Sequence, residues 1–164
     1  MKPTDFEGLL RRLLEAGVDF ILVGGVAATV HGSARATFDV DVVYSRAPQN
    51  IDRLVTTLAP IEPYLRGAPK GLPFVFDAGT IHRGLNFTLE TTQGDLDLLG
   101  EITGGGSYAD LRRDTTTISL FGYACLCVTL PKLIDLKRAA GRPKDNEILG
   151  ELQALLEERS RTGE

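Results

Sequence analysis

Tryptophan is absent from this 164-residue chain, which has only one methionine and two cysteines. Cys125 and Cys127 are too few for a disulfide framework or a complete zinc site, and their apolar surroundings predict a buried strand. No apolar run reaches the ~18 residues of a membrane span, so no membrane association is expected. Charged residues interrupt the apolar ones at the N-terminus, which excludes the usual pattern of a signal peptide. The predicted location is therefore the cytoplasm.

The chain also lacks a strong charge of either sign. Its 18 basic and 22 acidic residues leave a net charge of −4, so no overall basic field draws it toward nucleic acid. Hydrophobic residues make up 43% and charged residues 24%, as in ordinary globular proteins. This length predicts one domain over residues 1–164, with a core at about 18–130 and a C-terminal helical segment at about 131–160.

Hydrophobic periodicity predicts helices at both ends of the chain and strands between them. A helix over residues 4–16 has Thr4 as its expected N-cap, and Asn50 is the expected cap of a helix over 50–58. Four prolines make 60–73 a predicted loop. The other predicted helices are 26–31, 131–140 and one from Asp145 or Asn146 to about 159, and the strands are 19–23, 38–44, 85–92, 95–99, 115–120 and 123–130. The fold class is therefore α/β (or α+β), with a mixed or mainly antiparallel central sheet and flanking helices.

The stretch over residues 22–44 carries the chemistry. Gly24 and Gly25 end a strand and precede a small helix, where exposed backbone N–H groups can hold an anionic phosphate. Asp39 and Asp41 then share one face of the next strand. Two such carboxylates repel each other unless a cation lies between them, and hard oxygen ligands favour Mg²⁺ or Mn²⁺. Either feature alone is common on ordinary proteins, but the two together indicate phosphoryl chemistry.

This stretch resembles the nucleotidyltransferase superfamily typified by DNA polymerase β. The matching features are the glycine pair, the Asp39-x-Asp41 pair and a later strand carboxylate. The longer run GGVAATVHGSARATFDVDVV and the segment LPKLIDLKRAAGRPKD at 130–145 are similar to a small bacterial branch that includes toxin-type nucleotidyltransferases of abortive-infection systems. The resemblance implies a nucleotidyltransferase core bound to Mg²⁺ or Mn²⁺ through its carboxylates.

The resemblance also implies a third catalytic, metal-binding carboxylate, for which Asp97 is preferred over Asp95. The two share a strand face, but Asp95 abuts the predicted turn at 93–94, whereas Asp97 lies between leucines within the strand. A carboxylate among core residues needs a partner, and one at a turn is solvated without cost. A two-residue turn would place Glu90 opposite Asp97. A solvent-facing role for Asp97 stays open at this point.

Basic residues supply candidates for binding a triphosphate. Arg35 precedes the Asp39 strand, and Lys137 lies where the resembling branch carries a lysine; each could instead be an ordinary surface or snorkelling side chain. In the RPKD segment at 142–145, Asp145 could serve catalysis, a salt bridge or a helix cap. His31 is better explained as a hydrogen-bonded structural histidine than as a general base.

The function predicted from this resemblance is transfer of a nucleoside monophosphate from an NTP to an acceptor hydroxyl, with release of pyrophosphate. The expected acceptor is tRNA or a protein, as for the toxin of a toxin–antitoxin system with an antitoxin partner. An aminoglycoside is less expected, because five basic residues over 132–144 would suit a polyanion better than a polycation. The alternative is a catalytically degenerate fold that binds a nucleotide or a partner without turnover.

Overall fold

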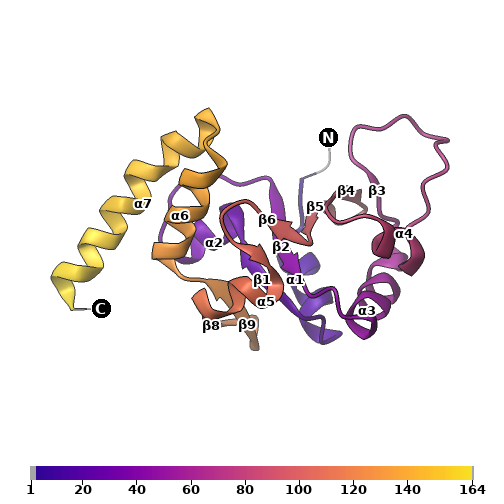
Figure 1. Cartoon of the computed structure of the whole chain (residues 1–164), viewed down its shortest axis with the longest axis horizontal. Helices are drawn as coiled ribbons and strands as arrows, with labels where there is room; N and C mark the ends of the chain where they lie inside the picture. Colours follow the sequence, from indigo (N-terminus) through magenta and orange to yellow (C-terminus); the bar gives the residue numbers. More distant parts are fainter. Residues whose placement is uncertain (1–2, 164) are drawn as a thin grey trace.

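The computed structural model describes residues 3–163 and is built around one mixed seven-stranded sheet in the order β3-β4-β5-β2-β1-β9-β8 (Figure 1). Its central strands pair in parallel, β2 with β5 and β1 with β9, and the other neighbouring pairs are antiparallel. The mixed sheet predicted from the sequence is therefore confirmed. The strands are β1 (Phe20–Val23), β2 (Asp39–Tyr44), β3 (Tyr64–Leu65), β4 (Phe87–Thr91), β5 (Gly94–Leu99), β8 (Thr115–Leu120) and β9 (Tyr123–Val128).

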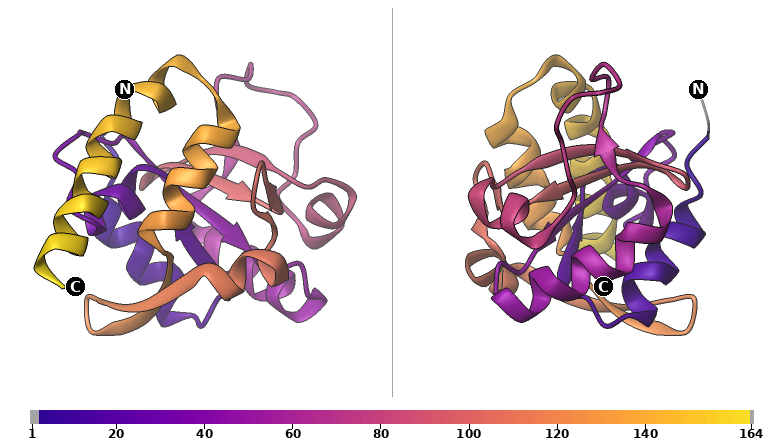
Figure 2. Two further views of the ribbon diagram at one scale, coloured as in Figure 1. Left: turned by 60° about the vertical axis from the view of Figure 1, so that its left-hand side comes forward. Right: turned by 90° about the vertical axis from the view of Figure 1, so that its right-hand side faces the viewer.

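Helices flank the sheet, as predicted from the sequence (Figures 1 and 2). At the C-terminal end α6 and α7 pack side by side, and α6 also packs against α2 (Figures 1 and 2). Within residues 3–163, no helix is both long enough and apolar enough to cross a bilayer. The helices are α1 (Phe6–Glu15), α2 (Gly24–Val30), α3 (Pro48–Leu58), α4 (Ala78–Arg83), α5 (Tyr108–Leu111), α6 (Leu130–Ala140) and α7 (Pro143–Thr162), with short 3₁₀ turns η1 (Ala59–Ile61) and η2 (Arg112–Asp114) and a small ribbon of β6 (Glu101–Ile102) and β7 (Gly106–Ser107).

The two faces of the central strands differ sharply in character. In β2 and β5, alternate residues Val40, Val42, Leu96 and Leu98 are fully buried. Because side chains alternate along a strand, the residues between them, which include the aspartates, lie on the opposite face. The apolar side of these strands belongs to one hydrophobic core that also contains leucines of α1 and α3. Burial of that side fixes which face of the sheet carries the carboxylates.

Three predicted helix caps are wrong, because each helix begins at a different residue. Asp5, not Thr4, caps α1 by accepting a hydrogen bond from the Gly8 N–H at 2.9 Å. Asn50 lies inside α3, buried, where its side-chain amide bonds the backbone of Asp19 and Ser45. Likewise α7 begins at Pro143, so Asp145 lies in its first turn. Polar residues near a helix start can satisfy tertiary partners as well as the first turn.

The hairpin of β4 and β5 has a different register from the one predicted. Asp97 pairs with Thr88, and Glu90 pairs with Asp95, so the expectation that Glu90 faces Asp97 is wrong. The Glu90 carboxylate instead accepts a hydrogen bond from Lys70 at 2.8 Å. The pairing shifts by two residues, and a shift of two leaves every side chain on its predicted face of the sheet.

The predicted hairpin of β8 and β9 is confirmed, with Phe121 and Gly122 in the left-handed region at its turn. Cys125 and Cys127 are buried in β9, as their apolar surroundings predicted. Burial raises the pKa of the Cys125 thiol to about 11 and that of Cys127 to about 12. Both thiols therefore act as small apolar side chains of the core.

Candidate functional site

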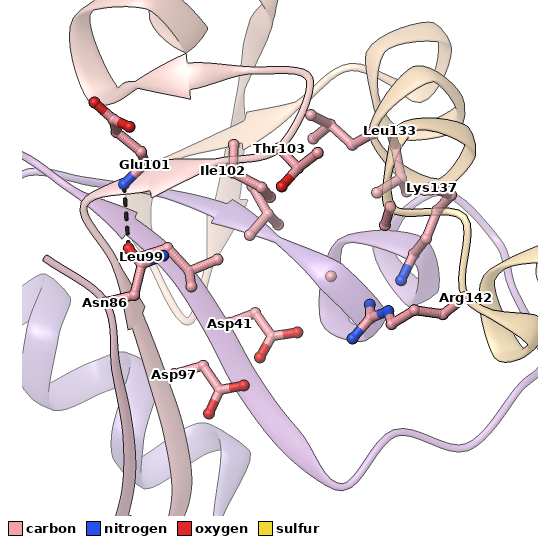
Figure 3. Close-up of a pocket in the computed structure, with 14 residues that line it drawn as sticks. Asp41, Asn86, Asp97, Leu99, Glu101, Ile102, Thr103, Leu133, Lys137 and Arg142 are labelled. Carbon is pink, nitrogen blue, oxygen red and sulfur yellow. Dashed lines mark hydrogen bonds between the residues drawn. The ribbon is translucent and has the colours of Figure 1, made fainter.

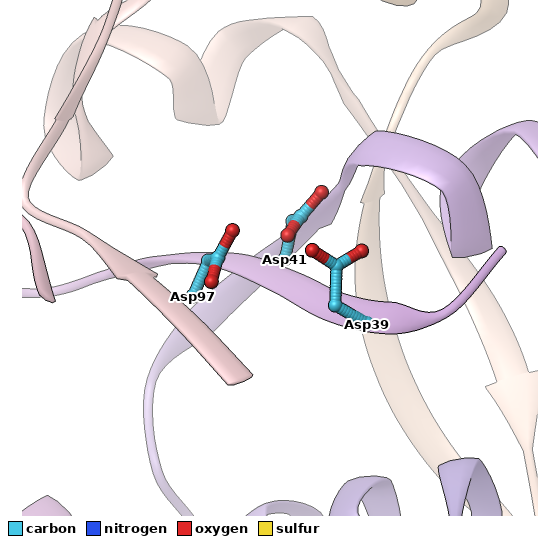
Figure 4. A group of neighbouring side chains, drawn as sticks. All are labelled: Asp39, Asp41 and Asp97. Atoms are coloured by element: carbon cyan, nitrogen blue, oxygen red, sulfur yellow. The ribbon is translucent and has the colours of Figure 1, made fainter. Parts of the chain in front are cut away.

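Two adjacent parallel strands bring three aspartates together at the surface of the sheet. In the pairing of β2 with β5, Asp41 lies opposite Asp97, and Asp39 lies opposite Asp95. One carboxylate oxygen from each of Asp39, Asp41 and Asp97 lies within 4.8 Å of the other two (Figure 4). Asp95 is not part of this group. The geometry thus groups Asp97, which was preferred on the sequence, with the Asp39-x-Asp41 pair; the catalytic roles of all three stay predictions.

The acidic cluster (Asp39, Asp41 and Asp97) has an unpaired carboxyl oxygen at its buried end. Oδ1 of Asp41 is buried and has no hydrogen-bond partner among the described residues. Burial, followed by the charges of Asp39 and Asp97, raises the pKa of Asp41 to about 8. Burial also raises the pKa of Asp39 above its ordinary value, with the nearby Asp97 adding to the shift. An orphaned carboxylate oxygen beside two further carboxylates fits a hard divalent cation well.

Glycine lets the main chain pass directly against this cluster. Gly24 begins α2 with φ +69°, in the left-handed region. A Cβ added there would collide with the carboxylate of Asp41, and one added at Gly25 would collide with the hydroxyl of Thr37. The helix therefore begins two residues earlier than predicted, and its first turn lies against Asp41. Backbone N–H groups placed so close to the carboxylates could meet a phosphate held by the same cation.

Arg66, which the sequence analysis did not identify, lies over the acidic cluster. Its Nη2 donates to Asp97 Oδ1 at 2.7 Å, and its Nη1 lies 3.8 Å from Asp39 Oδ2. Nε lies 3.4 Å from Asp95 Oδ2, so one guanidinium neutralises three aspartates. Arg66 follows the two-residue strand β3, inside the predicted loop 60–73. No local sequence pattern indicates a role for Arg66 at the site, because its contacts with the aspartates depend on how the segment after β3 folds back across the sheet.

Lys137 and Arg142 form a cationic wall that faces the cluster from α6 and from the start of α7 (Figure 3). Both are held by the buried Asp145. Arg142 Nε donates to its carboxylate at 2.6 Å, and Lys137 Nζ lies 3.5 Å away. Burial acts to raise the pKa of Asp145, but the hydrogen bond from Arg142 and the charges of Lys137 and Arg142 hold this pKa below its ordinary value. Asp145 also accepts a hydrogen bond from the Arg142 N–H at 3.2 Å. It therefore forms salt bridges and also bonds the backbone at the start of α7, two of the roles that the sequence left open.

Two cavities meet at the cluster and the cationic wall. One, of about 340 Å³, extends toward Ile102 and Leu136 (Figure 3). The other, of about 480 Å³, extends along the segment before β2 to the first turns of α7. Asp41, Asp97, Lys137 and Arg142 line both. A reaction that joins two substrates needs two such spaces with a shared reactive centre.

Arg35 lines the larger cavity but is already paired with acidic residues of α7. Its guanidinium lies 3.8 Å from a Glu147 carboxylate oxygen and 3.9 Å from one of Glu151. It also donates to the Glu147 carbonyl at 2.9 Å. These contacts connect the turn before β2 to α7. The nucleotide-binding roles of Arg35 and Lys137 stay predictions.

His31 lies at the end of α2 and is hydrogen-bonded at both ring nitrogens. Nε2 lies 2.7 Å from the Val128 carbonyl, so it carries the proton and donates. Nδ1 then accepts from Arg159 of α7 at 3.0 Å. The ring is buried and lines neither cavity. This environment favours the structural role over a general base.

Comparisons with known proteins support the fold. No family model and no curated protein matches the sequence. Among solved structures, the chain is similar to the crystal structure of a candidate nucleotidyltransferase from Thermotoga maritima, with a TM-score of 0.57. The match covers 91% of this chain and 92% of that one at 11% identity. The fold is therefore nucleotidyltransferase-like, and at this identity the likeness shows the fold alone.

Proposed function

We propose that this protein is a metal-dependent nucleotidyltransferase that transfers a nucleoside monophosphate from an NTP to an acceptor hydroxyl. The single observation that carries the proposal is the acidic cluster with its orphaned Asp41 oxygen, on a nucleotidyltransferase-like fold. The hydroxyl oxygen attacks the α-phosphorus, the bond to the β-phosphate oxygen breaks, and pyrophosphate leaves. Three carboxylates facing a cationic wall suit a reaction that depends on positioning and charge neutralisation.

Each residue has a distinct proposed role in this reaction. Asp39, Asp41 and Asp97 would hold Mg²⁺ or Mn²⁺, which when bound neutralises phosphate charge. Asp97, on the neighbouring strand, would also take the proton of the acceptor hydroxyl. Lys137 would face the phosphates from the wall, while Gly24 and Gly25 allow their close approach to the main chain, and Arg35 would assist from the rim of the larger cavity. Arg66 must leave the carboxylates before a cation occupies them.

The acceptor and the biological role are the finer part of this proposal. The similarity of residues 24–43 and 130–145 to toxin-type nucleotidyltransferases supports a cytoplasmic toxin with tRNA or a protein as the acceptor and an antitoxin as its partner. An aminoglycoside acceptor is the weaker choice. A screen with labelled NTP against separate pools of tRNA, protein and aminoglycosides would identify the labelled acceptor directly.

Arg66 supports a second candidate, a degenerate fold that binds a nucleotide or a partner without turnover. In that case its three contacts with Asp39, Asp95 and Asp97 would be a permanent replacement for the metal. The two candidates differ in one measurable property. An enzyme is stabilised by Mg²⁺ together with an NTP and releases pyrophosphate, whereas a degenerate fold with a permanent arginine binds without Mg²⁺ and releases none.

The direct test is to replace Asp39 or Asp41 with asparagine. Transfer should fall by at least about 10³-fold, since each change removes a charged ligand of the reaction centre. The variants should fold, and in buffer with EDTA their melting temperatures should stay level or rise, because one carboxylate of a repelling group is gone. Asp52→Asn, on the exposed side of α3, is the matched control. Full Mg²⁺-dependent activity in Asp41→Asn would overturn the proposal.

A further inference from the structure

Phe38 is the most exposed large hydrophobic side chain among residues 3–163, with 77% of its surface accessible. It directly precedes β2 and lines the larger cavity together with Asp39, Asp41 and Asp97. An aromatic ring left in water has no role in the packing of the core. Its place beside the proposed reaction centre suggests a ligand with a flat apolar face.

The main chain that carries this ring is fixed on both sides. The Phe38 carbonyl accepts a hydrogen bond from the Thr4 hydroxyl at 2.6 Å, and the same hydroxyl accepts from the Asp95 N–H at 3.1 Å. The Thr37 hydroxyl donates to the Asp39 carbonyl at 3.3 Å. These hydrogen bonds hold the backbone at the start of β2, so they fix the position of the Phe38 main chain next to the carboxylates.

Side chains of both charges line the larger cavity: the carboxylates of the acidic cluster, of Asp145 and of Glu147, and four cations that include Arg35. Lys137, Arg142 and Lys144 line it, and Lys144 is near enough to Asp39 to oppose the rise of its pKa, which burial dominates. At about 480 Å³ the space falls within the range of small-molecule sites. A nucleotide combines the two chemistries found here, phosphates for the cations and a base whose face stacks on an aromatic ring.

We propose that Phe38 is the stacking platform for a nucleobase bound in the larger cavity. This inference rests on the proposed function, because it places the phosphates of the same nucleotide at the acidic cluster and cationic wall. The base belongs either to the donor NTP or to the end of a nucleic acid acceptor. Stacking is tolerant of base identity, so Phe38 contributes affinity for bases as a class.

The chain contains no tryptophan, which allows a direct optical test. Phe38→Trp would introduce a unique indole whose fluorescence is quenched when a base stacks on it. Phe121→Trp, at the β8–β9 turn and outside both cavities, is the matched control. Each variant is titrated with Mg²⁺ plus ATP, GTP, CTP or UTP, with a short oligoribonucleotide, and with base-free tripolyphosphate. Quenching of Phe38→Trp by the NTPs, or by the oligoribonucleotide alone, is expected and identifies which substrate supplies the base.

Affinity measurements on Phe38→Ala provide the second readout. Loss of one stacked base should weaken binding of the base-bearing ligand roughly 5- to 100-fold and leave tripolyphosphate binding unchanged. Phe121→Ala should leave both unchanged. Equal binding of the base-bearing ligands by Phe38→Ala and wild type would overturn this inference alone. Absence of any Mg²⁺-dependent phosphate binding by the wild type would overturn the proposed function and this inference together.

Discussion

The excess negative charge of the acidic cluster is reduced in two ways: through the raised pKa of Asp41 and through the ion pairs of Arg66. Oδ1 of Asp41 is buried without a hydrogen-bond partner among the described residues, and burial and the neighbouring carboxylates raise the pKa of this side chain to about 8. Arg66 relieves the charge of Asp39 and Asp97 from the solvent side without bonding Asp41. A divalent ion would contact all three carboxylates, whereas the guanidinium neutralises only the outer part of the cluster. We therefore expect a divalent cation to compete with Arg66 for these carboxylates.

Replacing Arg66 with glutamine tests that exchange. The variant should bind Mn²⁺ roughly tenfold more tightly than the wild type, because no internal cation competes for the carboxylates. Its melting temperature in EDTA should fall, since three aspartates lose their neutralising group. Calorimetric titration with Mn²⁺ measures the affinity, and Arg83→Gln on α4 serves as the control. Unchanged Mn²⁺ affinity in Arg66→Gln would show that metal and guanidinium do not compete.

Secondary structure elements with strong local patterns were predictable, and their long-range partners were not. The apolar alternation of β2 and β5 predicted both strands and the face of their aspartates, because one buried side fixes that face. The hairpin register was missed by two residues, since the turn is at 92–93 rather than 93–94. Arg66 was missed for a different reason. Its position over the sheet comes from the packing of β3 on β4, which leaves no periodic signal near the residue.

Helix α2 is connected to α7 and β9 through His31, which predicts a specific acid sensitivity. Burial, with repulsion from Arg159, lowers the pKa of His31 despite its hydrogen bond to the Val128 carbonyl. The unfolded chain binds the proton near pH 6.5, and the folded protein binds it only at a lower pH. Stability from this group is thus complete above about pH 6.5 and is lost as the pH falls toward the lowered pKa.

Urea denaturation at about pH 5 and about pH 7.5 measures this effect. His31→Gln should be less stable than the wild type by about 1–3 kcal/mol at the higher pH, since a buried hydrogen-bonded group is disturbed. It should also lose part of the stability difference between the two pH values. The chain has one other histidine, the exposed His82, and His82→Gln should keep that difference. An identical pH dependence in His31→Gln and the wild type would contradict the prediction.

At the scale of the whole molecule, the basic strip expected to attract a polyanion is largely neutralised. The strip comprises Lys132, Lys137, Arg138, Arg142 and Lys144. Four of these five residues have a carboxylate within 4.0 Å, supplied by Asp114, Asp135 or Asp145. Lys144 has no such partner among residues 3–163. Counting cations along the sequence overestimates the net positive charge of the strip, because its acidic partners come from distant segments as well as from the same helices.

This neutralisation leads to a prediction for tRNA. Each phosphate that a protein cation neutralises steepens the fall of the binding constant with salt. With most of the strip paired, log K against log salt between about 50 and about 200 mM should have a slope no steeper than about −2. Gel-shift titrations with tRNA at several salt concentrations measure that slope, and Lys144→Gln should make it shallower while Arg53→Gln, on α3, does not. A slope of about −5 or steeper would show that tRNA displaces the internal carboxylates and uses the whole strip.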